Sequence, residues 1–137
     1  MHQSAKSKIQ DSQRQVTFYI RRVEETPAGL LVDGLCGDDT IVLGDVFTQA
    51  FKLGPHRTPD GRSIDPERRC LTRIELEVKH IEYFNKSMTF VSPGWQARLL
   101  VKGTINIGLG EGWGFSGTSQ QPLPSEAVAD ENAQWKK

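Results

Sequence analysis

Hydrophobic and polar residues alternate along most of this chain, in short runs bounded by glycine, proline and aspartate. Alternation with a period of two is typical of half-buried β-strands, and glycine or aspartate between such runs marks turns. Residues 16–20, 47–53, 71–84 and 95–102 alternate in this way, while 30–32, 41–43 and 103–115 are further candidate strands. The pattern predicts an all-β fold, which we expect to be a single closed, mostly antiparallel β-barrel of about six strands or more.

Residues 29–47 form the centre of this prediction. The apolar runs 30–32 and 41–43 are separated by Gly34, Gly37 and a pair of aspartates. Two short apolar runs with turn residues between them predict a β-hairpin.

The longest alternating run is 71–84. Its apolar face holds Ile74, Leu76 and Val78 and continues to His80, whereas Ile81 falls on the opposite, charged face. Residues 85–92, which follow it, are expected to form a loop, and the glycine-rich 108–114 is expected to be a bend in the last strand.

The two ends of the chain are polar. Residues 1–15 are expected to be a flexible tail, residues 16–116 the β-barrel domain, and residues 117–137 a polar tail that either stays extended or forms a short helix from Ser125. Within the domain, residues 54–70 interrupt the strand pattern with three prolines. A long loop of this kind is either functional or simply solvated. We expect it to be mobile and to contribute to a partner interface through four arginines: Arg57, Arg62, Arg68 and Arg69.

The glycines of the central stretch are spaced in a specific order. Gly29 and Gly34 come first, and Gly44 is followed directly by Asp45. Between them lie a turn at Asp39, which stands in place of a further glycine, and the aliphatic Ile41. A second block follows a specific order too. It has a strand at 78–84, then Pro93-Gly94, then an alternating strand that ends at Gly103. Together the blocks resemble domain II of elongation factor Tu and its relatives. The resemblance covers about residues 16–115 and implies the domain II β-barrel, with Cys36 facing its core.

The family's activities do not all follow from this resemblance. The chain has no Walker A sequence, so we expect neither nucleotide binding nor GTPase activity. In relatives that carry aminoacyl-tRNA, the strand matching 81–84 helps to hold the acceptor end, and its glutamate matches Glu82. The cation that usually follows three positions later is Asn85 here, so aminoacyl-tRNA is not an expected partner, and Glu82 is predicted to be a surface or strand-pairing residue.

Composition narrows the remaining functions. The net charge of the 137 residues is zero, which disfavours a general binder of nucleic acid or anionic membranes. No histidine or cysteine has metal-ligand spacing, no serine or cysteine lies in a nucleophile motif, and no apolar run reaches the roughly 20 residues of a membrane span. We therefore expect no enzymatic activity, no cofactor and no metal, in a cytoplasmic protein with two reduced thiols.

The sequence predicts a non-catalytic binding module that docks on a protein partner or on RNA. Glu82 and the four arginines of 54–70 are its candidate binding residues. A small bacterial immunity protein or antitoxin that masks a toxin is the alternative, because a single catalytically bare domain suits both.

Overall fold

The computed structural model of the chain describes residues 14–54, 57–63, 67–105 and 108–124. Its strands are β1 (Arg14–Thr26), β2 (Gly29–Cys36), β3 (Ile41–Val42), β4 (Val46–Leu53), β5 (Arg68–Tyr83), β6 (Lys86–Met88), β7 (Phe90–Val91), β8 (Gln96–Thr104) and β9 (Trp113–Ser119). The prediction of an all-β fold is confirmed.

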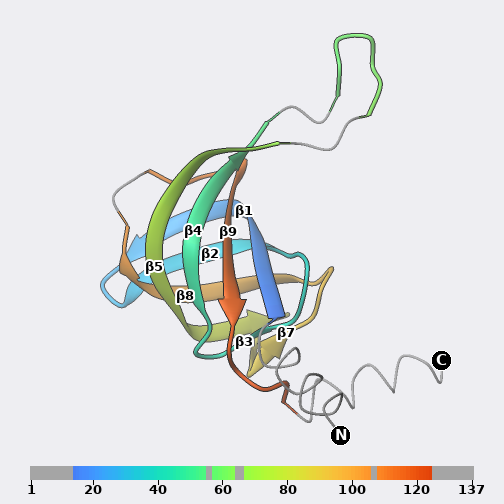
Figure 1. Cartoon of the computed structure of the whole chain (residues 1–137). Helices are drawn as coiled ribbons and strands as arrows, with labels where there is room; N and C mark the ends of the chain where they lie inside the picture. The colour runs from blue at the N-terminus through green and yellow to red at the C-terminus, as the bar shows by residue number, and fades with distance from the viewer. Residues whose placement is uncertain (1–13, 55–56, 64–66, 106–107, 125–137) are drawn as a thin grey trace, which may run out of the picture.

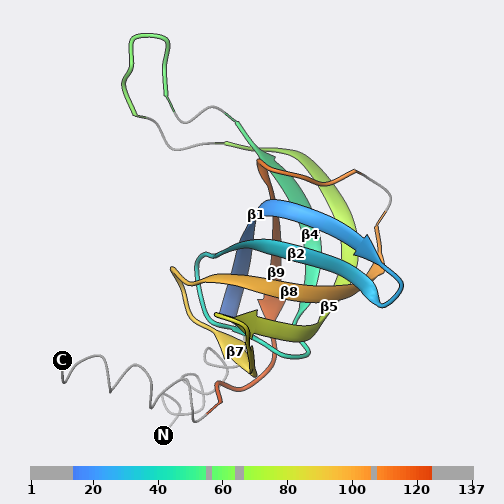
Figure 2. The ribbon, with the colours of Figure 1, turned by 180° about the vertical axis from the view of Figure 1, so that it is seen from behind.

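The hydrogen bonds of the main sheet run in a ring through six strands. Their order is β4-β9-β1-β2-β8-β5, and β5 pairs again with β4 (Figure 1). Each of these pairings is antiparallel. Strand β6 continues the sheet beyond β5, while β3 and β7 form a separate two-stranded sheet at one end of the ring (Figure 2).

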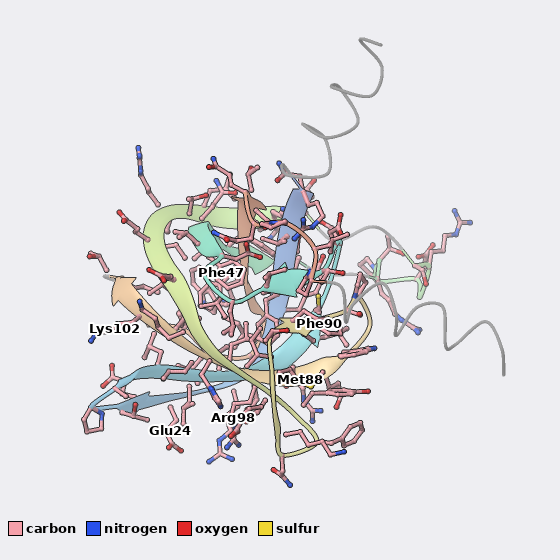
Figure 3. All side chains as sticks on the ribbon, turned by 90° about the horizontal axis from the view of Figure 1, so that it is seen from below. Glu24, Phe47, Met88, Phe90, Arg98 and Lys102 are labelled. Carbon is pink, nitrogen blue, oxygen red and sulfur yellow. The ribbon has the colours of Figure 1, made fainter. Side chains whose placement is uncertain are left out.

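The main core lies inside the ring. Phe47 and Phe115 are fully buried there and stack with ring centroids 5.2 Å apart, and Figure 3 shows Phe47 enclosed by the strands. Burying one such side chain stabilises the fold by about 2 kcal/mol. Cys36 is also buried in this core, as the resemblance implied.

The predicted central hairpin is wrong. Strand β2 pairs with β1 and β8, whereas Ile41 and Val42 pair with Val91 and Phe90 of β7. The glycines and aspartates between the two apolar runs do mark a turn, but that turn leads the chain out of the main sheet. Asp39, placed where the resemblance has a turn glycine, is outside the positive-φ residues of the described chain.

Strand β5 departs from strict alternation. Its register with β8 shifts between Val78 and His80, the mark of a β-bulge. The extra residue reverses the faces, so Ile81 is buried and His80 is half-exposed, contrary to the predicted pattern. The predicted loop at 85–92 is also wrong, because it contains both β6 and β7.

The last strand lies later than predicted. Residues 108–112 are outside any strand, a turn bonds the Trp113 amide to the Gly110 carbonyl, and β9 then runs to Ser119, into the predicted tail. At the other end, Arg14 and Gln15 of the predicted N-terminal tail belong to β1. The rest of that tail, residues 106–107 and the predicted helix from Ser125 lie outside the described residues.

Candidate functional site

The β5–β6 hairpin carries an exposed aromatic residue in its turn. Tyr83 pairs with Lys86, so Phe84 and Asn85 alone make the turn, with φ of 51° and 62°. Positive φ at both positions is the type I′ arrangement that matches the twist of the flanking strands. Asparagine tolerates it well, but a bulky aromatic residue adopts it rarely. Phe84 is 80% exposed, so burial does not offset this strain. Strained, exposed aromatic residues are a signal of a binding surface.

An aromatic cluster supports this turn from behind. The Tyr83 ring stacks on Trp95 with centroids 4.2 Å apart and planes 13° apart, and Phe84 lies 4.5 Å from Tyr83. Phe90 contacts the other side of the cluster, 5.5 Å from Trp95. Met88 packs there too, and Figure 3 shows Met88 and Phe90 at the same end of the ring. The base of the turn is therefore held by packing.

Four charged residues lie directly opposite one another across four neighbouring strands. Arg22 of β1 is opposite Asp33 of β2, Asp33 is opposite Arg98 of β8, and Arg98 is opposite Glu82 of β5. We call these four residues the charge row, along which the signs alternate. Directly opposite residues of an antiparallel pair project from the same face of the sheet. Figure 3 shows Arg98 on the outward face, away from the core.

The centre of the charge row is a two-point ion pair. Arg98 donates from Nε to Asp33 Oδ1 at 2.7 Å and from Nη2 to Oδ2 at 3.3 Å. The hydrogen bond and the negative charge of Asp33 raise the pKa of Arg98, so its guanidinium stays charged at any physiological pH. The two hydrogen bonds therefore hold the side chains of Asp33 and Arg98 in a fixed relative orientation.

The two ends of the charge row are weakly engaged. The side chain of Arg22 is 73% exposed and its guanidinium lies 4.0 Å from Glu24. Glu82 lies 3.8 Å from His80 Nε2 on an exposed part of β5. Exposed pairs at such separations contribute little to stability, so both end groups can engage a partner.

An open groove of about 970 Å³ joins the charge row to the aromatic turn. All four residues of the charge row line it, together with Tyr83, Phe84 and Trp95. Arg21, Asn85, Gln96 and Glu111 are further lining residues. Aromatic residues and arginine are enriched at protein-binding surfaces. We call this surface the groove.

The structure separates Glu82 from the four predicted arginines. Glu82 lies in the groove, opposite Arg98 and Ser87 in the sheet. Arg57 and Arg62 lie in 57–63, which stands away from the ring beyond the ends of β4 and β5 (Figure 1). Arg62 is highly exposed and lies 3.4 Å from Asp60. None of the four arginines lines the groove.

Arg68 and Arg69 are strand residues. Both pair with β4, so the end of the predicted loop belongs to the sheet. The Arg68 guanidinium lies 4.4 Å from the centre of the buried Phe51 ring and 3.7 Å from Asp38. Arg68 therefore anchors the end of the insertion to β4 and to the turn that follows β2. Arg69 lies 3.9 Å from Glu67.

A buried polar network near the start of β1 escaped the sequence analysis. Arg14 is 6% exposed and donates to the Gln121 carbonyl at 2.8 Å and to Ser119 Oγ at 3.2 Å. Ser119 Oγ in turn donates to the buried Asp45, which also accepts from the Val42 amide at 2.8 Å. Burial raises the pKa of Asp45, although these bonds and the nearby Arg14 act against the rise. The network holds β1, β9 and the end of β3 together, so we interpret it as stabilising the fold.

Metal binding and nucleophilic chemistry both depend on histidine, cysteine and acidic side chains. No cluster of three or more histidine, cysteine or acidic residues with metal-binding geometry occurs among the described residues. Burial raises the pKa of the Cys36 thiol to about 12, which makes it a poor nucleophile. In the same part of the chain, no helix has the length and hydrophobicity that a membrane crossing requires.

Comparison of the chain with known protein families, with curated proteins and with solved structures finds no match in any of the three. The site therefore has to be interpreted from its own geometry.

Proposed function

We propose that this chain is a non-catalytic binding module, a β-barrel of the elongation factor Tu domain II type that docks a protein partner in the groove. The observation that carries the proposal is Phe84, an aromatic side chain held exposed and in a strained backbone conformation at the rim of the groove. If the turn only had to connect two strands, Asn-Gly would be the favoured pair at these two positions. A binding partner that buries the ring supplies the reason for phenylalanine.

The domain II assignment rests on the ring of six strands and on two glycines of the resemblance. Gly44 has a φ of +92°, and at Gly34 any side chain would collide with the backbone of Tyr19 on the neighbouring strand. Asp45, which completes the Gly-Asp pair, accepts a hydrogen bond from the Val42 amide. The residues that carry the resemblance are thus required at turns and at close contacts between paired strands.

Charge favours a protein over RNA as the partner. The groove is lined by three arginines but also by Asp33, Glu82 and Glu111, and Arg98 is already bonded to Asp33. A phosphate backbone needs unpaired cations, because counterion release supplies much of the affinity for nucleic acid. Alternating charges instead suit a surface that itself carries both signs.

The test is affinity capture with the tagged chain and a matched pair of turn variants. Phe84→Ala removes the ring that we expect to anchor the partner, whereas Asn85→Gly changes the same turn and keeps the ring. We expect capture of a defined protein by the wild type and by Asn85→Gly, and its loss, at least about tenfold, with Phe84→Ala. Equal capture by all three chains would contradict the proposed site, and a partner that ribonuclease removes would assign the groove to RNA.

A further inference from the structure

The signs of the charge row have a symmetry property. Read across the sheet from Arg22 to Glu82, they are positive, negative, positive, negative. A two-fold axis through the middle of the row, between Asp33 and Arg98, reverses this order. When the row faces a copy of itself that is rotated about this axis, each residue therefore faces a residue of opposite charge.

We propose that the groove binds a second copy of this chain in an isologous dimer, with the two charge rows facing each other in opposite directions. The inference rests on the proposed docking function of the groove and names its occupant. In the dimer, Arg22 faces Glu82 of the second copy, and Asp33 faces Arg98 of the second copy. An isologous interface requires a surface that complements itself, and the charge row meets that requirement.

The surroundings of the row suit such an interface. Next to it along the strands, Leu31 of β2 lies opposite Leu100 of β8, and both are half-buried. On the other side, Leu35 is 37% exposed and Phe84 is 80% exposed. Residues two apart on a strand share a face, so Leu31 and Leu35 flank the row on its own side. Apolar residues thus border the charges on both sides, and they supply area that the second copy buries.

The dimensions are compatible with a dimer contact. Neighbouring strands lie about 4.8 Å apart, so the charge row spans about 14 Å. A patch of this width with its apolar borders fits within the roughly 800 Å² per partner of a standard interface.

The two kinds of residue have separate tasks in the dimer. Asp33 and Arg98 are hydrogen-bonded within each copy, so they enter the interface already satisfied. Within the described part of one copy, Arg22 lies 4.0 Å from Glu24 and Glu82 lies 3.8 Å from His80, and their short contacts form between copies. Facing charges fix the orientation of the two chains, while the buried aromatic and aliphatic surface supplies most of the affinity.

Charge-reversal variants in sedimentation velocity test the pairing. We expect the wild type to form dimers, and Arg22→Glu or Glu82→Arg to weaken dimerisation at least about tenfold, since each reversal creates two like-charge contacts per dimer. Mixing the two variants in equal amounts should restore dimers, because each position 22 then faces a position 82 of opposite sign. The double variant carrying both reversals should dimerise for the same reason.

Two control variants make the same charge reversals at residues outside the charge row. Arg73→Glu and Glu75→Arg alter exposed residues of β5 outside the groove, and both should leave dimerisation unchanged. Circular dichroism of every variant confirms that the fold is retained. If the controls weaken the dimer as much as the row variants do, net charge rather than pairing is responsible and the proposal fails.

Two results distinguish this inference from the proposed function. A wild type that stays monomeric at about 1 mM, yet captures another protein in a Phe84-dependent way, overturns the dimer and keeps the docking function. Dimers whose single reversals are not restored by mixing also overturn the dimer geometry. Absence of both dimers and Phe84-dependent capture overturns both proposals.

Discussion

Tyr83 and Trp95 stack face to face, 4.2 Å between centroids, although one ends β5 and the other precedes β8. The backbone of Trp95 is fixed as well, because its carbonyl accepts from the Cys36 amide at 3.0 Å and its amide donates to the Ser92 carbonyl at 3.1 Å. The stack therefore joins the end of β2, the start of β8 and the β5–β6 hairpin, and it supports the wall of the groove.

Trp95→Ala should lower the free energy of unfolding by about 2–3 kcal/mol, because it removes a partly buried indole and two aromatic contacts. Tyr83→Phe keeps the stacked ring and should change stability by less than about 0.5 kcal/mol. Urea unfolding followed by circular dichroism measures both. Equal stability of the alanine variant and the wild type would mean that the stack contributes nothing to the hairpin.

The type I′ turn predicts opposite roles for its two residues. Asn85→Gly should raise the free energy of unfolding by about 0.5 kcal/mol, since glycine fits the second central position best. Phe84→Asn should stay within about 1 kcal/mol of the wild type, because relief of the strained φ offsets the lost contact with Tyr83. Thermal and urea unfolding check both, and a loss above about 2 kcal/mol in Phe84→Asn would show that the ring stabilises the free protein.

The two cysteines should react at different rates. Cys70 is exposed, whereas Cys36 is buried, with its Sγ 3.2 Å from the Asp39 carbonyl oxygen and a pKa raised to about 12 by desolvation. At pH 8, a disulfide reagent should modify one thiol of the native chain quickly and the second only in denaturant. Cys70→Ser should abolish the fast phase. Rapid modification of both thiols would mean that the core opens near Cys36.

Asp45 should make stability depend on pH in the acid range. Its pKa in the folded state is raised above the ordinary 3.8 by burial, so the folded state favours the protonated form. This contribution is fully present below pH 3.8 and is lost as the pH rises through the raised pKa. The difference in unfolding free energy between the wild type and Asp45→Asn should therefore fall with rising pH across that window and become constant above it.

Urea unfolding from about pH 3 to about pH 7 measures this difference. Asp60→Asn is the comparison, because hydrogen bonds from Thr58 and the Arg62 amide lower the pKa of the exposed Asp60 and reverse the direction of any effect. A difference between wild type and Asp45→Asn that does not vary with pH would contradict the raised pKa.

Arg68 should anchor the insertion to the ring. Arg68→Ala removes the contact with the Phe51 ring and the ion pair with Asp38, which together should cost about 1 kcal/mol. Arg62→Ala, at an exposed pair within 57–63, should cost nothing measurable. The Gly54 amide donates to the Glu67 carbonyl. Its hydrogen exchange should become faster in Arg68→Ala and stay unchanged in Arg62→Ala. Unchanged stability of Arg68→Ala would place the anchor elsewhere.

Local alternation was sufficient to predict most strands of the ring, although β9 was placed too early in the sequence. Val16, Phe18 and Ile20 are buried as their spacing predicts, and so are Ile74, Leu76 and Val78. The bulge in β5 was beyond such reasoning, because a single extra residue depends on pairing with β8 and leaves no local signal. The pairing of β3 with β7 failed to be predicted for the same reason, since two-residue strands carry too little pattern.

The site could be predicted only in part. Glu82 was singled out through the resemblance, but its row partners lie on three other strands, and only the register brings them together. Arg14 was assigned to a tail because a charged residue has no hydrophobic signature, yet Asp45 and Ser119 make its burial possible. Phe84 left one usable signal, because it is an aromatic residue next to an asparagine at the end of a long predicted strand.

Strand β9 lies between β1 and β4 in the ring, yet it is the last of the described strands along the chain. Of the described strands, β1 to β8 therefore leave the ribosome before β9 can close the gap between β1 and β4. Until Trp113–Ser119 emerges, β1 and β4 present unpaired edges, and the groups that Phe115 will cover stay open to water. Folding must wait for the contacts of β9 with β1 and β4, which are distant in the sequence, and this makes folding slow. Nascent chains that stop short of β9 are the species most exposed to aggregation and chaperone binding.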